Sequence, residues 1–458
     1  MNRNAIAAFV VFLITIVIFY ISKDFILFWD TIQFAGHHPQ YYYDSGFSSL
    51  FLPNKLDSGH IPIFGMYIAW VWKIIGKSLW SSHLAMMPFV FLCLWHAYLL
   101  GLKWIPSKAW LFPLVIICMP QSVSQFMLVS PDVVLLCFFL GLFLSLEEEK
   151  KNWVIAHSIG LVLISNRGFI LLSAFMLWSF LKSWNTKNRF KTIALFIPAI
   201  IVFSGYQLSH WFHIGWAGTH SEMPWSMSFS MIGFETIFKN ILVYGWRLMD
   251  FGAVIIWIIM GYYIYKKPRS LITSRSFQLL VIMILLFGIV TIPFSGLMQH
   301  RYFIPIQVLA GFILLKWILS YEMYGKRSRV LIGSTLLFLI LGNCWIYPDK
   351  IAQGWDSTLA HLPYYSMQNR VTTYLNENKI DKEEVATAFP LRSPQSILNV
   401  NGDASQFHNK DEGETDYILY SNVMNDFSDK EVEILKHQWI AVKAWRSFEV
   451  KMILYKRL

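Results

Sequence analysis

The sequence predicts a mainly α-helical, polytopic membrane protein with a small soluble α/β domain at its C-terminus. Hydrophobic residues make up 55% of the 458 residues and charged residues only 14%, whereas a soluble chain carries roughly a quarter charged residues. Long apolar runs alternate with short basic loops up to residue 347. From residue 348 onward, charged residues become more frequent and the long apolar runs end.

The apolar runs predict about eleven transmembrane helices. We expect these helices at about 5–23, 82–102, 109–127, 132–146, on both sides of SNRG at 165–168, and at about 192–209, 249–265, 277–295, 303–320 and 329–347. No signal-peptide cleavage site follows the first run, so we expect it to be retained with the N-terminus in the cytoplasm. Every dense basic cluster then falls on one side. The formal net charge of +10 is therefore explained by membrane topology, and no nucleic-acid partner is predicted.

A long segment on the outer side, residues 24–80, separates the first two helices. Within it, residues 61–76 (IPIFGMYIAWVWKIIG) are apolar but short for a span, so we expect a juxtamembrane helix in the outer interface. A short transmembrane helix is the alternative. The expected domains are a transmembrane domain, 1–347, and an extracytoplasmic α/β domain, 348–458. Strands are expected in DYILYSNVM and in the C-terminal WRSFEVKMILYKRL.

The cysteines and the clustered histidines do not predict a metal site. The cysteines lie in or next to apolar runs without CxxC spacing, which is typical of core residues: Cys93, Cys118, Cys137 and Cys344. His37 and His38 lie near Asp44, but adjacent histidines in an extended segment point to opposite sides and make a poor ligand pair. The run Tyr41–Tyr43 is typical of an interfacial aromatic belt, with a sugar platform as the alternative.

Asp30 is the most conspicuous charged residue of the outer segment. It follows Phe28-Trp29 just past the first apolar run, at the expected membrane surface. A carboxylate at this depth is costly unless it is solvated, paired or used. An aromatic-rich loop, the pattern D-x-G-H-x-P at 57–62 and an apolar stretch ending in Gly76 follow in that order.

Four segments resemble, in order, the GT-C glycosyltransferases of the protein O-mannosyltransferase and aminoarabinose-transferase branch. FWDTIQFA (28–35) with GHIPIFGMYIAWVWKIIG (59–76) resembles the family's first outer loop, which has an acidic residue and an [HK]-P-P-L motif. SPDVVLLCFF (130–139), LVLISNRGFILL (161–172) and HRYFIPIQVLAG (300–311) resemble its later motifs. Two departures are Ile61 in place of the first proline and Thr31 in place of a second acidic residue.

The resemblance implies an integral-membrane glycosyltransferase of the bacterial cytoplasmic (inner) membrane. Such an enzyme moves a sugar from a polyprenyl-phosphate donor to a glycan, lipid or protein acceptor on the outer face. Because phosphate is already a good leaving group, the reaction needs one base for the acceptor hydroxyl and cations for the phosphate. We expect Asp30 to be the base, with inversion at the anomeric carbon. A divalent metal is compatible with this chemistry but not required, and no cofactor is predicted.

His60, Arg167 and Arg301 are the expected donor phosphate-binding residues, because the planar fork of an arginine can bind two phosphate oxygens. The alternatives are that the two arginines are snorkelling anchors at helix ends and that His60 stabilises its loop. Asp57 and Asp132 are expected to support the site.

Asp57 and Asp132 have alternative roles in the local backbone structure. Asp57 orients His60 or belongs to a turn with Ser58-Gly59. Asp132 follows Pro131 and serves the site or simply begins its helix, where an acid suits the helix dipole. Tyr302 is a third supporting residue, next to Arg301. The outer segment 210–225 is aromatic and could line the acceptor entrance, but its spacing does not decide this.

Two other classes of function are compatible with the sequence. A transporter or flippase for lipid-linked sugars places polar groups at mid-bilayer on interrupted helices, often in repeated halves. Here the candidate residues lie at helix ends on one side, and no repeat is visible. A non-catalytic assembly partner is the other alternative. The absence of a GxGxxG fingerprint in the sequence argues against a cytosolic nucleotide-sugar enzyme.

Overall fold

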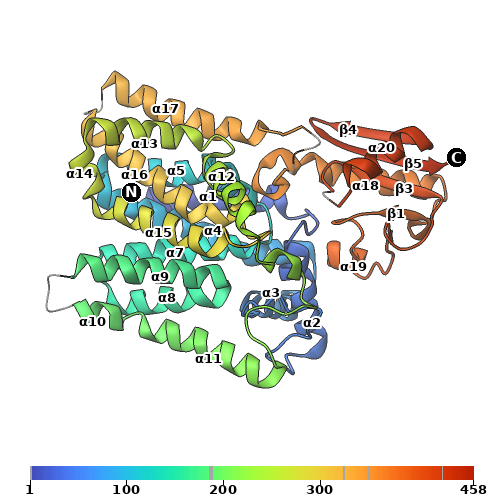
Figure 1. Ribbon diagram of the computed structural model, residues 1–458, viewed down its shortest axis with the longest axis horizontal. Helices are drawn as coiled ribbons and strands as arrows, with labels where there is room; N and C mark the ends of the chain where they lie inside the picture. The colour runs from blue at the N-terminus through green and yellow to red at the C-terminus, as the bar shows by residue number, and fades with distance from the viewer. Residues whose placement is uncertain (1–2, 185–188, 323–324, 349–350, 352, 425) are drawn as a thin grey trace.

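The structure is a computed structural model that describes residues 3–184, 189–322, 325–348, 351, 353–424 and 426–458. A bundle of helices forms one part and a smaller domain with a β-sheet caps one end of it (Figure 1). The N-terminus lies near the opposite end of the bundle, together with the short helices α10 (Arg189–Ala194) and α14 (Pro268–Ile272).

Helices occupy each stretch where the sequence predicts one. In the first half they are α1 (Arg3–Ser22), α4 (Leu79–Trp104), α5 (Leu111–Cys118), α6 (Pro120–Phe126), α7 (Pro131–Glu147), α8 (Lys151–Ile164) and α9 (Asn166–Lys182). In the second half they are α11 (Ile197–Ile214), α13 (Val254–Lys266), α15 (Arg275–Thr291), α16 (Ile304–Tyr321) and α17 (Lys326–Leu341). A further helix, α12 (Phe234–Met249), lies in a stretch where the sequence predicted none. The expected continuous helix 109–127 is wrong, because the chain breaks between α5 and α6 at Pro120, whose ring has no N–H to donate.

The number of helices that cross a membrane stays a prediction. Within the described residues, four helical stretches are long and apolar enough to do so: Arg3–Ser22, Leu79–Trp104, His300–Tyr321 and Lys326–Cys344. Two bent pairs, α6 with α7 at 116° and α12 with α13 at 94°, raise the number to six if each pair is one span. Several further apolar helices are shorter, among them α8 and α15.

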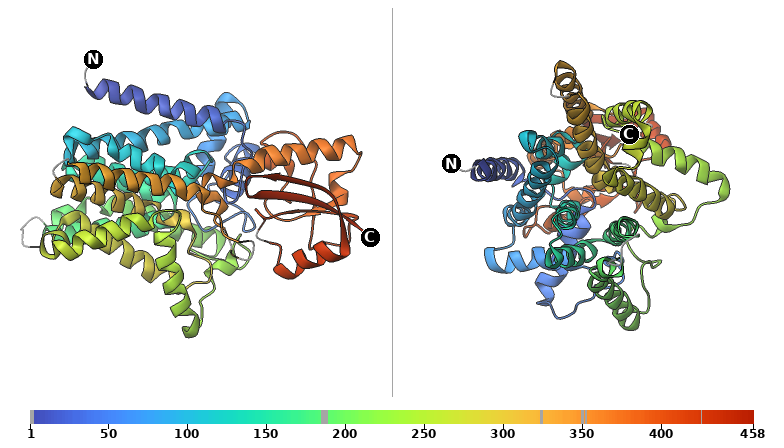
Figure 2. Two further views of the ribbon diagram at one scale, coloured as in Figure 1. Left: turned by 90° about the horizontal axis from the view of Figure 1, so that it is seen from above. Right: turned by 90° about the vertical axis from the view of Figure 1, so that its left-hand side faces the viewer.

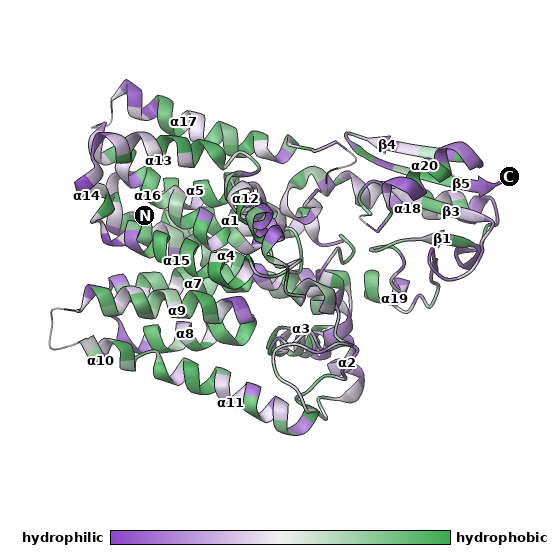
Figure 3. Ribbon diagram, in the orientation of Figure 1, coloured by the Kyte–Doolittle hydropathy of each residue, from purple (hydrophilic) through white to green (hydrophobic). Residues whose placement is uncertain are grey.

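Burial separates the centre of the bundle from its periphery. The span that contains α16 is 89% buried, whereas the spans of α1 and α17 are only 22% buried. Apolar side chains such as Phe9 and Phe338 are consequently exposed on the outside of the bundle. Figure 3 shows hydrophobic residues along these helices. A helix that is hydrophobic on an exposed face needs an apolar surrounding, which a bilayer supplies.

The outer segment folds into helices at the end of the bundle that faces the C-terminal domain. A π-helix, η1 (Ile32–His37), continues into α2 (His38–Ser45), so the extended conformation expected for His37 and His38 is wrong. The apolar stretch forms α3 (Ile63–Ile75), which runs across the direction of the bundle helices (Figures 1 and 2). Trp72 Nε1 donates to Ser82 Oγ of α4 at 2.8 Å and fixes this orientation.

The C-terminal domain is a five-stranded mixed sheet with helices. Its strand order is β2 (His408–Asn409), β1 (Val385–Thr387), β3 (Tyr417–Ser421), β5 (Val450–Arg457) and β4 (Trp439–Ser447). β1 is parallel to both of its neighbours, and β5 is antiparallel to both of its neighbours. The helices are α18 (Pro363–Glu377), α19 (Gln395–Leu398) and α20 (Asp429–Gln438). The strands expected in 416–424 and 445–458 are therefore present.

Hydrogen bonds attach this domain to α6 and to the outer segment. Ser124 Oγ and Gln125 Nε2 of α6 both donate to the backbone oxygen of Asp356 at 2.7 Å. The backbone N–H of Leu27 donates to the oxygen of Leu398 at 2.9 Å. The domain is thus held against both the helix ends and the outer segment, and the candidate site lies between these parts.

Candidate active site

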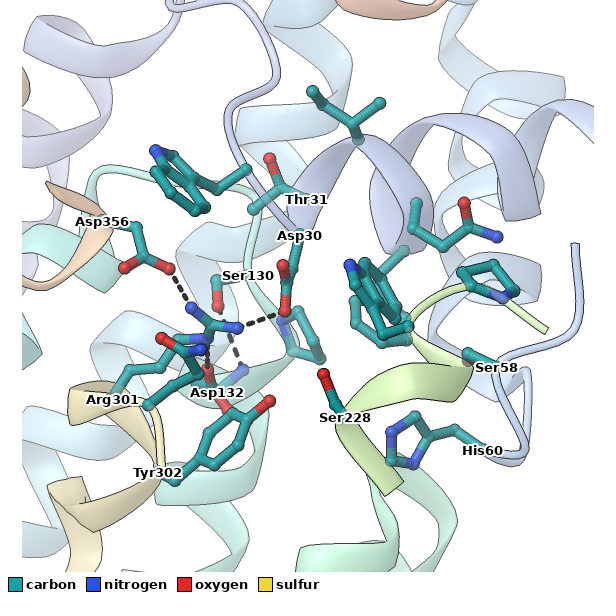
Figure 4. A pocket seen from close by; sticks show the side chains of 18 of the residues that line it. Asp30, Thr31, Ser58, His60, Ser130, Asp132, Ser228, Arg301, Tyr302 and Asp356 are labelled. Carbon is teal, nitrogen blue, oxygen red and sulfur yellow. Dashed lines mark hydrogen bonds and ion pairs between the residues drawn. The ribbon is translucent and has the colours of Figure 1, made fainter. Parts of the chain in front are cut away.

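A cavity of about 460 Å³ lies where the bundle, the outer segment and the C-terminal domain meet. Most of the residues predicted from the sequence line it: Asp30, His60, Asp132, Arg167, Arg301 and Tyr302. Asp57 is not among the lining residues, although its neighbour Ser58 is. Residues from widely separated parts of the chain therefore form one site, part of which Figure 4 shows.

The turn after α1 places Asp30 at the cavity. The hydroxyl of Thr31 accepts from the N–H of Phe28 at 2.8 Å and donates to the oxygen of Phe28 at 2.7 Å. Trp29 adopts a left-handed conformation with φ 54°. The buried ring of Phe28 stacks on His361, with ring centroids 5.0 Å apart. Thr31, which departs from the family motif, closes this turn.

Arg301 contacts three carboxylates from three different elements. Its Nη2 contacts Asp30 Oδ2, its Nη1 contacts Asp356 Oδ2 of η6 (Trp355–Ser357), and its Nε lies 3.2 Å from Asp132 Oδ2 in the first turn of α7. The Arg301 side chain is 5% exposed. A snorkelling arginine keeps its charge in water, so the structure contradicts the anchor alternative for Arg301. All three nitrogens of its guanidinium have carboxylate partners.

Arg167 has one guanidinium nitrogen whose hydrogen-bond donors are unused among the described residues. Its Nη2 lies 2.5 Å from Asp132 Oδ1, but its buried Nη1 has no hydrogen-bond partner among the residues that the structure describes. Its guanidinium lies over the ring of Tyr302 at 4.1 Å, and that of Arg301 lies over the same ring at 5.1 Å. Tyr302 thus contacts both cations. Of the two arginines, Arg167 is the one able to accept a further anion without losing a partner.

The charges of this cluster do not balance. Three carboxylates and two guanidiniums leave one formal negative charge in a poorly solvated site. Burial raises the pKa of Asp30, Arg301 opposes this, and the carboxylates of Asp356 and Asp132 raise the pKa further. Asp30 is also the most accessible carboxyl, 22% exposed against 4% for Asp132 and 6% for Asp356. Of the three carboxyls that contact Arg301, Asp30 is therefore the one most open to the cavity.

His60 is positioned by the start of α9. The N–H of Asn166 donates to His60 Nδ1 at 3.2 Å, and Asn166 Nδ2 donates to the oxygen of Gly59 at 3.0 Å. Burial, with the charge of Arg167, lowers the pKa of His60 to about 3. A neutral imidazole that accepts at Nδ1 carries its proton on Nε2. His60 thus offers a neutral hydrogen-bond donor and not a cation.

Asp57 does not orient His60. Its Oδ1 accepts from the N–H of Gly59 at 2.8 Å, which is the turn that the sequence suggested. Its Oδ2 lies 2.9 Å from Nε2 of His210 on α11, and both side chains are almost completely buried. His210 Nδ1 contacts the backbone oxygen of Trp216 at 2.6 Å. Asp57 therefore ties the loop before α3 to α11 and to the aromatic outer segment 210–225, of which Trp225 lines the cavity.

Comparison with known proteins finds structural neighbours but no sequence match. No protein-family model matches the chain, and no curated protein matches it. The crystal structure of ArnT from Cupriavidus metallidurans bound to undecaprenyl phosphate is similar over 98% of this chain and 97% of that chain, with a TM-score of 0.49 and 11% sequence identity. The structure of the same protein in the apo state gives the same score and identity. The cryo-EM structure of the arabinofuranosyltransferase AftD from Mycobacteria is similar over 100% of this chain and 40% of that chain, with a TM-score of 0.47 and 10% identity.

Asp356 is the functional candidate that the sequence reasoning missed. It lies more than fifty positions after Arg301 in the chain, directly past the last apolar run. A signal was nevertheless present, because Trp355-Asp356 repeats the Trp29-Asp30 pair that follows the first apolar run. In both cases an aspartate just beyond a helix reaches the same guanidinium.

The structure does not place the remaining polar residues of the outer segment at a metal centre. His38 Nε2 contacts the oxygen of Leu56 at 2.8 Å, and Asp44 accepts from Gln40. Tyr42 is buried and donates to the oxygen of Leu50 at 2.8 Å, so it belongs to the core of this segment. Within the described part of the chain, no group of three His, Cys, Asp or Glu side chains is arranged to hold a metal ion.

Proposed function

We propose that the protein is an integral-membrane glycosyltransferase that takes a sugar from a polyprenyl-phosphate donor. The observation that supports this most directly is Asp30, an accessible carboxylate with a raised pKa, held by Arg301 and facing a cavity that also contains Arg167 and His60. The four sequence motifs that resemble the GT-C family contribute most of these residues. The cavity is lined by residues of the bundle, the outer segment and the C-terminal domain, at the end of an apolar bundle where a membrane lipid and a water-soluble group can meet.

Asp30 acts as the general base in the proposed reaction. Arg301 holds Oδ2, which leaves Oδ1 to take the proton from the acceptor hydroxyl. The acceptor oxygen forms a bond to the anomeric carbon as the bond from that carbon to the phosphate oxygen breaks. The electron pair of the broken bond goes to the phosphate. One displacement inverts the anomeric carbon.

Arg167 and His60 stabilise the phosphate as its charge develops. Arg167 Nη1 is buried without a partner and can donate to a phosphate oxygen, and His60 Nε2 can donate from the neighbouring loop. Arg301 has a different task. Each of its guanidinium nitrogens already contacts a carboxylate. We therefore propose that Arg301 positions Asp30, in place of the phosphate-binding role expected from the sequence.

The proposed orientation places the cavity on the outer face of a bacterial cytoplasmic membrane. The start of α1 and the short helices α10 and α14, whose sequences contain Lys191 and Arg269, lie at the end of the bundle away from the C-terminal domain. The positive-inside rule assigns that end to the cytoplasm. The transverse helix α3 then lies in the outer interface, and the C-terminal domain is extracytoplasmic.

The test uses purified protein in nanodiscs with short-chain polyprenyl-phosphate sugars. Binding of the donor and release of free polyprenyl phosphate are followed for the wild type and for Asp30→Asn, with a membrane extract as the source of acceptor. We expect both proteins to bind the donor and only the wild type to release polyprenyl phosphate. If the wild type binds no lipid-phosphate sugar, the enzyme proposal is wrong and a transporter or assembly role takes its place.

A further inference from the structure

A second cavity, of about 590 Å³, lies on the C-terminal domain next to the candidate active site, with which it shares lining residues. Arg392 and Ser393, which follow β1, line both cavities. From there the second cavity extends past Gln406 to the edge strand β2 and the turn after it. A ligand that ends at Asp30 and leaves the site on this side would pass along this groove.

Hydrogen bonds fix the walls of the groove. Gln406 Nε2 donates to the oxygen of Arg392 at 3.0 Å, and Asn409 Nδ2 donates to Glu412 Oε1 at 3.0 Å. The far end of the same loop is also fixed, because Ile397 and Leu398 contact the outer segment at Gly36 and Leu27. These contacts attach the loop that lines the groove to the segment that carries Asp30.

The chemistry of the lining selects against charged and apolar ligands. Carboxylates of Glu383 and Glu412 line the groove, and Asp426 of the first cavity lies 3.9 Å from Arg392, which lines both cavities. Phosphates and uronic acids would be repelled by the excess of carboxylates. Amide, imidazole and carboxylate groups suit a ligand with many hydroxyl donors. The one large apolar lining residue, Phe407, is buried and offers little to a lipid tail.

We propose that this groove binds the acceptor, and that the acceptor is an uncharged, hydroxyl-rich glycan. The proposal rests on the proposed glycosyltransferase function and adds the class of acceptor to it. The donor approaches from the bundle side, at Arg167 and His60, and the glycan approaches from the C-terminal domain. One acceptor hydroxyl reaches Asp30 while the preceding sugar units lie along Arg392 and Asn409.

The test applies nanodisc-embedded protein to an array of neutral, uronic-acid-containing and phosphorylated glycans. The groove variant is Glu383→Gln combined with Asn409→Ala. The matched control is Glu377→Gln, an exposed residue of α18 outside the cavities described above. We expect the wild type and the control to bind neutral glycans, and the groove variant to bind them about 10-fold or more weakly, as the loss of a hydrogen bond to a charged group predicts. Binding of polyprenyl phosphate, measured in the same preparations, should be equal in all three proteins.

The outcomes separate the two proposals. Lipid-phosphate binding without binding of any neutral glycan, or glycan binding that the groove variant retains, overturns the acceptor groove alone. A preference for the phosphorylated or uronic-acid glycans overturns it as well. Glycan binding without lipid-phosphate binding overturns the proposed glycosyltransferase instead.

Discussion

Replacing Asp30 by asparagine removes the proposed base while keeping the shape of the side chain. Loss of a general base costs about 10²- to 10⁴-fold in rate, which corresponds to about 2.7–5.4 kcal/mol in the barrier. Donor binding should be retained or improved, because the substitution removes the one excess negative charge of the cluster. Arg301 keeps the carboxylates of Asp132 and Asp356 as partners.

The same substitution should not destabilise the fold. A raised pKa means that the folded protein prefers the protonated form of Asp30, and this contribution to stability is lost as the pH rises through the folded-state pKa. At neutral pH the ionised carboxylate therefore opposes folding, and a neutral asparagine should leave the unfolding temperature equal or higher. This result would distinguish a lost base from a misfolded protein.

The assay measures single-turnover release of polyprenyl phosphate from a short-chain donor, together with donor binding and thermal unfolding in nanodiscs. Asp24→Asn is the matched control, because Asp24 also follows α1 but its side chain is 78% exposed and does not line the cavity. We expect the control to match the wild type. Asp30→Asn with more than a tenth of the wild-type rate would refute the assignment of the base. An equally large loss in the control would trace the effect to the membrane surface and not to the site.

Four further substitutions test the roles of the surrounding residues. Arg167→Ala should raise the Kd of the donor about 10- to 100-fold, as the loss of a charge-assisted hydrogen bond predicts, and an unchanged titration would exclude Arg167 from phosphate binding. Arg301→Ala removes the cation shared by three carboxylates and should lower stability by about 3–5 kcal/mol, so an unchanged denaturation midpoint would contradict its positioning role. His60→Gln should weaken donor binding by less than about 10-fold, because a neutral hydrogen bond contributes about 1 kcal/mol. The factor between wild type and variant should be the same at pH 5 and pH 8, because His60 is neutral at both. Asp356→Asn should move the acidic limb of the pH–rate profile to lower pH, because the Asp356 carboxylate raises the pKa of Asp30. If the limb does not move, Asp30 is not the group whose titration causes it.

The helices could be predicted from the sequence because their signal is local. Apolar runs bounded by basic loops indicate helices without knowledge of the fold, and the structure has a helix in each expected stretch. The exceptions have local causes as well. Pro120 divides one expected helix, and the segment after Trp29 is helical where an extended chain was expected, because the Thr31 hydroxyl closes a turn just before it.

The pairing of side chains could not be predicted in the same way. The sequence identified Asp30, Asp132 and Arg301 as candidates, but their mutual contact depends on how α7, η4 (His300–Phe303) and the outer segment pack together. Asp57 illustrates the limit, because its partner is His210, far along the chain, and not His60 three residues away. Charge pairs of this kind form only in the tertiary fold, and a single sequence does not show which charged side chain pairs with which.

The position of Asp356 gives the C-terminal domain a part in the chemistry. Its backbone oxygen accepts from both Ser124 and Gln125, and its carboxylate contacts Arg301. The segment that begins the C-terminal domain is therefore built into the wall of the cavity, and it contributes to the charge that raises the pKa of Asp30. Because Asp356 is bonded both to α6 and to Arg301, the bundle and the start of the C-terminal domain depend on each other. A site of this kind is complete only when both parts are folded and docked, which would restrict the proposed sugar transfer to the assembled protein.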